Sequence, residues 1–217
     1  MAEAKLLISS RNYSSWSLRG YLLCRLSGLS FSVFAAAADD PQARAELTLR
    51  SSTIRLPSLL HGAVTVWDTL AIAEYLNELH PDAKMWPEPC RERAHARSIS
   101  GEMHSGFAAL RSSLPLNMRA RRPRYQPWSG TRADIALIQE IWRGCLEAHG
   151  GPWLFGGRPT IADAMYAPVA SRFLTYDVEL EPLPAAYRDH ILGWEPMVEW
   201  MADAVLEPEA IEELEVD

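Results

Sequence analysis

A short segment with two prolines, residues 85–89 (Met-Trp-Pro-Glu-Pro), divides this chain into two stretches with different hydrophobic patterns. Before it, short apolar runs alternate with stretches of helical periodicity, which is typical of an α/β unit. After it, every apolar pattern has the helical period, and proline-rich segments often join domains. The sequence therefore predicts an α/β domain over residues 1–84 and an all-helical domain over residues 91–217.

The first stretch begins with a predicted strand, helix and strand over residues 5–9, 15–28 and 29–36. An arrangement of this kind forms a right-handed βαβ unit. The remaining elements predicted before the linker are a short helix at 41–50, two strands at 56–60 and 63–66 joined by a tight turn, and a helix at 68–80 that ends before Pro81.

The second stretch is predicted to hold helices at 92–118, 131–149, 160–176, 185–192 and 195–205. Thr160 and Asp163 have the spacing of a capping box, which indicates a folding role at the start of one helix. A basic segment, residues 119–124, connects the first two helices. It is either a solvated loop or a site that attracts an acidic second substrate or partner.

Charge and cysteine content exclude several classes of protein. The 217 residues carry 21 Lys and Arg against 28 Asp and Glu, a formal charge of −7, which argues against a general nucleic-acid binder. Three scattered cysteines form no disulfide framework, and neither a metal-ligand spacing nor a glycine-rich phosphate loop is present. With no signal peptide and no apolar run of about 18 residues, we expect a cytoplasmic protein without a membrane span.

Proline at a strand start is the first feature that suggests a ligand site. Pro57 follows Leu56 directly before a predicted strand. It is either an edge-strand proline or a cis-proline that leaves the backbone of Leu56 free to pair with an extended peptide ligand.

Two predicted helix starts offer similar alternatives. Asp68 and Thr69 either cap their helix or hold a ligand that bears both a carboxylate and an ammonium group. The serine-rich turn at residues 12–17 either caps the first helix or offers a hydroxyl that stabilises a thiolate.

These three motifs, in this order, resemble those of the glutathione transferases over nearly the whole chain. Residues 14–17 (Ser-Ser-Trp-Ser) are similar to the Ser-Ser-Cys-Ser segment of the zeta class, and residues 56–59 (Leu-Pro-Ser-Leu) to the Val-Pro-x-Leu signature. Asp68-Thr69 resembles the acidic-Ser pair, and residues 157–163 the Thr-x-Ala-Asp segment. The resemblance implies a thioredoxin-like domain followed by an α-helical C-terminal domain, assembled as a homodimer.

The resemblance also implies the residues of a glutathione site. Ser14 becomes the hydroxyl that stabilises the glutathione thiolate, with Ser15 as the alternative. The backbone of Leu56, with Pro57 cis, pairs with the cysteinyl part of glutathione. The other glutathione-binding residues are Arg55, Asp68 and Thr69.

A pocket for the second substrate is expected between the domains. Methionine and aromatic residues at helical spacing more often pack in a hydrophobic core, and a lone histidine more often lies at the surface or caps a helix. Arg172 is similar to a carboxylate-binding arginine of zeta-class isomerases. The candidates are Tyr13, Met103, His104, Phe107 and Arg172.

The sequence thus favours transfer of glutathione, as co-substrate, to an electrophilic small molecule, without metal or redox cofactor. Trp16 stands where the zeta class has cysteine, which argues against thiol-exchanging members. Two alternatives stay open. One is a glutathione-dependent cis–trans isomerase of the maleylacetoacetate type, and the other is a non-catalytic protein that binds a partner on the same fold.

Overall fold

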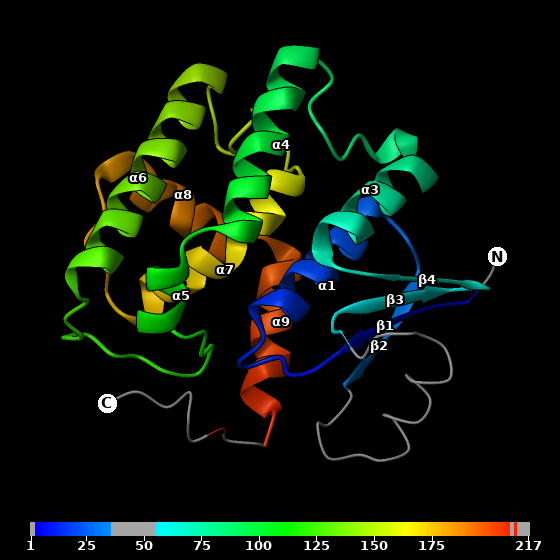
Figure 1. Ribbon diagram of the computed structural model, residues 1–217, viewed down its shortest axis with the longest axis horizontal. Coiled ribbons are helices and arrows are strands. Elements are labelled where there is room, and N and C mark those ends of the chain that lie inside the picture. The colour runs from blue at the N-terminus through cyan, green and yellow to red at the C-terminus, as the bar shows by residue number, and fades with distance from the viewer. Residues whose placement is uncertain (1–2, 36–54, 209–210, 212–217) are drawn as a thin grey trace.

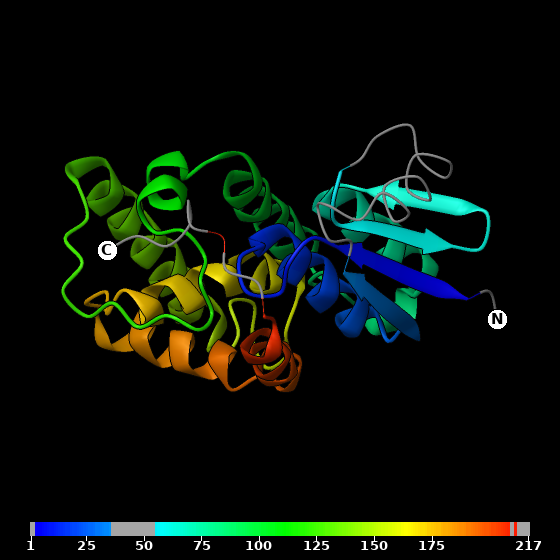
Figure 2. The same ribbon diagram turned by 90° about the horizontal axis from the view of Figure 1, so that it is seen from below.

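The computed structural model, which describes residues 3–35, 55–208 and 211, begins with a four-stranded mixed sheet (Figures 1 and 2). The strand order is β2-β1-β3-β4, with β1 and β2 parallel and both pairs that involve β3 antiparallel. The predicted strand–helix–strand unit is confirmed, whereas the predicted helix at 41–50 lies outside the described residues. The strands are β1 Ala4–Ile8, β2 Phe31–Ala35, β3 Ser58–His61 and β4 Val64–Trp67.

Two helices of this part begin and end where the sequence has capping residues. Helix α1 (Ser15–Ser27) begins after Ser14, whose hydroxyl accepts a hydrogen bond from the backbone N–H of Ser17, and ends at Gly28 with φ of 75°. Glycine adopts this left-handed conformation without a Cβ penalty. Helix α3 (Thr69–Leu79) begins after Asp68 and is followed by a short 3₁₀ helix, η1 (Pro81–Ala83).

The proline-rich segment packs against the helical part of the chain. Met85 and Trp86 are buried, and the carbonyl of Met85 accepts a hydrogen bond from the N–H of Ile161 at 2.9 Å. The segment therefore contributes to the core that joins the sheet to the helices.

The helical part packs around a cluster of aromatic side chains. Trp142 is buried in contact with Tyr166, Phe173 and Tyr187, which come from two other helices. Within the described residues, no helix is long and apolar enough to cross a membrane. The helices are α4 Cys90–Ser105, α5 Ala108–Ser113, α6 Ser129–His149, α7 Ile161–Thr175, α8 Pro182–Leu192 and α9 Glu195–Leu206.

The prediction of one helix over residues 92–118 is wrong, because the chain leaves the helix at Gly106. A Cβ at this position would lie 2.8 Å from the carbonyl oxygen of Glu102. Phe107 follows with a φ of 58°, and α5 ends before Pro115. Periodicity misses this break because both helices keep their apolar residues on the side that faces the core.

Helix α1 is the element that connects the two parts of the molecule. It packs against α3 on the sheet side and against α7 and α9 on the other side, as Figure 1 shows. The predicted capping box at the start of α7 is confirmed: the carboxylate of Asp163 accepts hydrogen bonds from the N–H and hydroxyl of Thr160. Through α1, the sheet side of the molecule is packed directly on the helical part.

Candidate functional site

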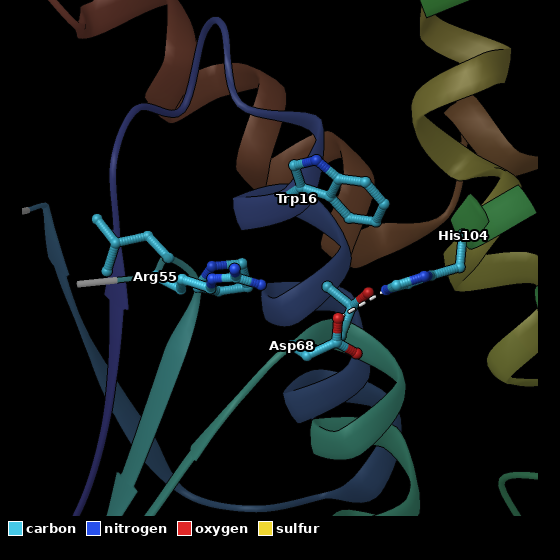
Figure 3. Close-up of a pocket in the computed structure, with 7 residues that line it drawn as sticks. Trp16, Arg55, Asp68 and His104 are labelled. Carbon is cyan, nitrogen blue, oxygen red and sulfur yellow. Dashed lines mark hydrogen bonds and ion pairs between the residues drawn. The ribbon is translucent and has the colours of Figure 1, made fainter. Parts of the chain in front are cut away.

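A cavity of about 320 Å³ lies where the starts of α1 and α3 meet the segment before β3 and the end of α4. Its volume falls at the lower end of the range of about 300–1,000 Å³ typical of small-molecule sites. Figure 3 shows four of its residues converging from these separate segments. The lining residues are Trp16, Arg55, Leu56, Pro57, Asp68, Thr69 and His104.

The Leu56–Pro57 peptide bond is cis, as predicted. Pro57 lies against α1, where a Cβ added at Gly20 would come within 2.9 Å of the proline ring. Glycine is therefore needed for this close approach of α1 to Pro57. Gly20 inside a predicted helix was the sequence signal for the contact, and it was missed.

Asp68 caps α3 and forms the wall of the cavity at the same time. Its Oδ1 accepts hydrogen bonds from the N–H of Leu70 at 2.9 Å and of Ala71 at 3.4 Å. Its backbone has a φ of 74°, a conformation that costs free energy in a residue other than glycine. Strained residues of this kind are concentrated at ligand sites, where the surrounding structure holds them.

Thr69 and Arg55 provide further polar groups beside Asp68. The Thr69 hydroxyl is buried and makes no hydrogen bond within the described residues. It lies in the first turn of α3, where backbone N–H groups and the helix dipole favour an anion. A ligand carboxylate would give this hydroxyl the partner that it lacks.

The three serines around the start of α1 have different partners. Ser14 is half-buried and accepts from the N–H of Ser17, whereas Ser15 is buried. The hydroxyl of Ser17 is fully buried and bonded to the N–H and hydroxyl of Ser9. Ser14 and Ser15 precede the cavity-lining Trp16 directly but do not line the cavity themselves.

Comparison with known protein families identifies the class of protein to which this chain belongs. The chain matches the N-terminal domain of the glutathione S-transferases over residues 13–79 and their C-terminal domain over residues 101–203. The chain belongs to the glutathione S-transferase family of enzymes. Glutathione, the co-substrate of this family, carries an ammonium group, carboxylates and a thiol.

Several proteins that are similar to this glutathione S-transferase are named maleylacetoacetate isomerases. A probable maleylacetoacetate isomerase of Caenorhabditis elegans is 25% identical over 190 residues, 87% of this chain and 88% of that protein. A glutathione transferase homologue of Burkholderia, solved with bound glutathione, has a TM-score of 0.70 at 20% identity, covering 95% and 100% of the two chains. A maleylacetoacetate isomerase of Anaeromyxobacter dehalogenans, also with bound glutathione, has a TM-score of 0.63 at 23% identity, covering 96% and 98%.

His104, at the end of α4, contacts the side of the cavity formed by the start of α3. Its Nε2 donates to Oδ2 of Asp68 at 2.7 Å, drawn as a dashed line in Figure 3. The sequence predicted a role for His104 in the second-substrate pocket, and the structure brings it to Asp68, a residue that the sequence predicted to bind glutathione. The two residues are 36 positions apart, so no local motif links them.

Trp16 is a cavity residue that the sequence treated only as a substitution for cysteine. Its ring lies 5.2 Å from the imidazole of His104. The guanidinium carbons of Arg19 and Arg111 each lie 4.7 Å from its centroid, which is within cation–π range. A large aromatic side chain therefore occupies the position where the zeta class carries a thiol.

Three arginines gather behind Trp16 without an acidic partner. Burial, together with repulsion from Arg111 and Arg172, lowers the pKa of Arg19, and burial with repulsion from Arg111 lowers the pKa of Arg172 to about 9. Burial also lowers the pKa of Arg111. Across residues 3–35 and 55–208, no carboxylate forms an ion pair with any of them. Their guanidinium groups donate instead to backbone carbonyls, among them those of Met165, Gly106 and Leu114. Of the three, Arg19 and Arg172 are buried and Arg111 is half-buried.

The other residues predicted for the second-substrate pocket do not line this cavity. Met103 and Phe107 are buried in the core. Tyr13 accepts a hydrogen bond from Arg119, and Arg172 donates from Nε to the carbonyl of Leu114. Elsewhere in the described part of the chain, no group of three His, Cys, Asp or Glu side chains could hold a metal ion.

Proposed function

We propose that this homodimeric cytoplasmic protein transfers glutathione to an electrophilic small molecule, with Ser14 holding the thiolate. The observation that carries the proposal is the meeting of two helix starts and the Leu56–Pro57 segment around one cavity. A hydroxyl can accept and donate at the same time. Ser14 accepts from the N–H of Ser17, so its own proton is available to a sulfur at the start of α1.

In this mechanism the protein contributes binding, orientation and charge stabilisation. The γ-glutamyl ammonium lies beside Asp68, and its carboxylate receives the Thr69 hydroxyl at the positive end of the α3 dipole. The thiol loses its proton to solvent, and the Ser14 hydroxyl and the start of α1 stabilise the thiolate. The thiolate then attacks an electrophilic carbon. A carbon–sulfur bond forms while a leaving group departs with its electron pair, or a proton is added to the adduct.

Titration calorimetry with glutathione tests the γ-glutamyl site. Wild-type protein should bind with a micromolar to millimolar Kd, and Asp68→Ala should lose at least about 1.4 kcal/mol, or tenfold, because the ammonium loses its counter-charge. Asp68→Asn removes the negative charge but keeps a side-chain oxygen that can cap α3, so it separates the effect of the charge on binding from the effect of capping. Asp82→Ala, at an exposed carboxylate on η1, is the matched control and should bind like wild type. An absence of binding in wild type would favour the non-catalytic, partner-binding alternative.

A second candidate is a glutathione-dependent cis–trans isomerase that acts on a maleyl-type acid. Arg111, the half-buried member of the arginine cluster, favours it, because it lies beside the cavity residue Trp16 and a dicarboxylic substrate would place negative charge there. Relatives that carry the name maleylacetoacetate isomerase support the same reading. In this reaction the thiolate adds to the double bond, the bond rotates, and the thiolate leaves again.

Turnover of a maleyl-type acid without net consumption of glutathione would support the isomerase. Under this reading Arg111→Ala should raise the KM for the acid about tenfold or more, since a charge-assisted hydrogen bond contributes about 1.5–3 kcal/mol. Arg91→Ala, at an exposed arginine on α4, is the control and should leave the KM unchanged. An equal rise in the KM in both variants would instead indicate a general effect of removing one positive charge.

A further inference from the structure

The turn between β1 and α1 is bound by a single carboxylate from the other end of the chain. Glu207 accepts hydrogen bonds from the hydroxyl of Ser10 at 2.8 Å, the N–H of Arg11 at 3.0 Å and the N–H of Asn12 at 2.7 Å. The Ser10 hydroxyl in turn accepts from the N–H of Tyr13 at 2.9 Å. Glu207 therefore satisfies, directly or through Ser10, polar groups of four successive residues.

The loop between α5 and α6 makes a second set of hydrogen bonds to the same turn and to Glu207. Arg119 donates to the backbone carbonyl of Glu207 and, at 3.1 Å, to the hydroxyl of Tyr13. The N–H groups of Met118 and Arg119 donate to the carbonyl and side-chain oxygens of Asn12 at 3.3 and 3.1 Å. The sequence left two alternatives for the basic segment at residues 119–124, a solvated loop or a site for an anion. The structure shows that the start of this segment packs against the turn.

The turn bound in this way leads straight into the start of α1. Ser14 follows Tyr13 directly, so the placement of its hydroxyl depends on the path of residues 10–13. Successive backbone N–H groups that point to one side form a cradle for an anion. Hydrogen bonds to a charged acceptor are roughly twice as strong as neutral ones, so Glu207 holds the turn firmly.

We propose that Glu207 is a positioning residue that holds the Ser14 hydroxyl in register with the glutathione sulfur. The inference rests on the proposed function of Ser14. Glu207 touches neither substrate, and it acts through residues 10–13. The C-terminal end of α9 is thereby part of the thiol-activating apparatus, although it lies 195 residues away from the turn in sequence.

The experiment compares Glu207→Ala, Glu207→Gln and the control Asp203→Asn in the full chain. Asp203 lies one helical turn earlier on α9 and pairs with the side chain of Arg11 at 3.2 Å, without bonding to the backbone of the turn. Hydrogen–deuterium exchange over residues 10–18 reports the order of the turn without ligand. Ultraviolet absorbance of the thiolate against pH reports the pKa of bound glutathione.

In Glu207→Ala we expect faster exchange confined to residues 10–18, a rise in the pKa of the bound thiol, and about a tenfold fall in kcat with a smaller change in the KM for glutathione. In exchange rate, thiol pKa and kcat, Glu207→Gln should lie between Glu207→Ala and wild type, and Asp203→Asn should match wild type. Unchanged exchange in Glu207→Ala would overturn the inference, and so would faster exchange with an unchanged thiol pKa. If wild-type protein bound no glutathione, the proposed function would fail first, whatever the exchange result, and the inference would fail with it.

Discussion

Ser14→Ala should lower kcat/KM for conjugation of a chloronitrobenzene about tenfold to a hundredfold, because a hydrogen bond to a charged acceptor contributes about 1.5–3 kcal/mol. The pKa of the bound thiol should rise toward the value of about 8.5 of a free cysteine thiol. Steady-state kinetics and a pH titration of thiolate absorbance measure both effects.

The controls for Ser14→Ala separate chemistry from folding. Removing this N-cap should also cost about 1 kcal/mol of stability, so each variant needs an unfolding curve. Ser98→Ala removes an exposed hydroxyl on α4 and should leave kinetics unchanged. If Ser15→Ala lost activity while Ser14→Ala kept it, the assignment to Ser14 would be wrong and the buried neighbour would be the active hydroxyl.

Asp163→Ala should reduce the free energy of unfolding by at least about 3 kcal/mol, since each buried donor left without a partner costs about 1–3 kcal/mol. The carboxylate is completely buried and accepts from Leu154 N–H, Thr160 N–H and hydroxyl, and Tyr187 hydroxyl at 2.7–3.0 Å. Denaturant unfolding followed by circular dichroism measures the loss. Glutathione binding should persist at temperatures where the variant remains folded, because Asp163 lies away from the cavity lining.

An exposed aspartate on a neighbouring helix provides the comparison for Asp163. Asp189 on α8 pairs only with the adjacent Arg188 among the described residues. Asp189→Ala should therefore change stability by no more than about 0.5 kcal/mol, as is usual for surface positions. A loss in Asp163→Ala as small as this would mean that the buried network contributes little to folding.

Local spacing made the fold and its helix starts predictable from sequence. The strand–helix–strand unit, a serine cap on α1 and the capping box at Asp163 all depend on residues within a few positions of one another. The cis-proline at Pro57 was implied by the family resemblance and not by spacing. The break at Gly106 was not predicted, because hydrophobic periodicity does not report the backbone conformation at this residue, where a Cβ would lie too close to the carbonyl oxygen of Glu102.

Sequence spacing did not predict which side chains face the cavity. Trp16 looked like a substitution in a motif, yet it lines the cavity beside Arg111. His104 and Met103 are adjacent in sequence, but one reaches Asp68 while the other is buried in the core. Such differences depend on how α4 is rotated against α1 and α3.

The sequence by itself determined the two-part architecture, the family and the residue types at the helix starts, because these depend on short-range periodicity, capping and motif order. Only the tertiary structure decided which distant groups meet: His104 with Asp68, three arginines behind Trp16, and Glu207 with the turn before Ser14. The physical reason is that hydrogen bonds and charge interactions act over a few ångströms in space. Chain packing, not sequence separation, sets those distances.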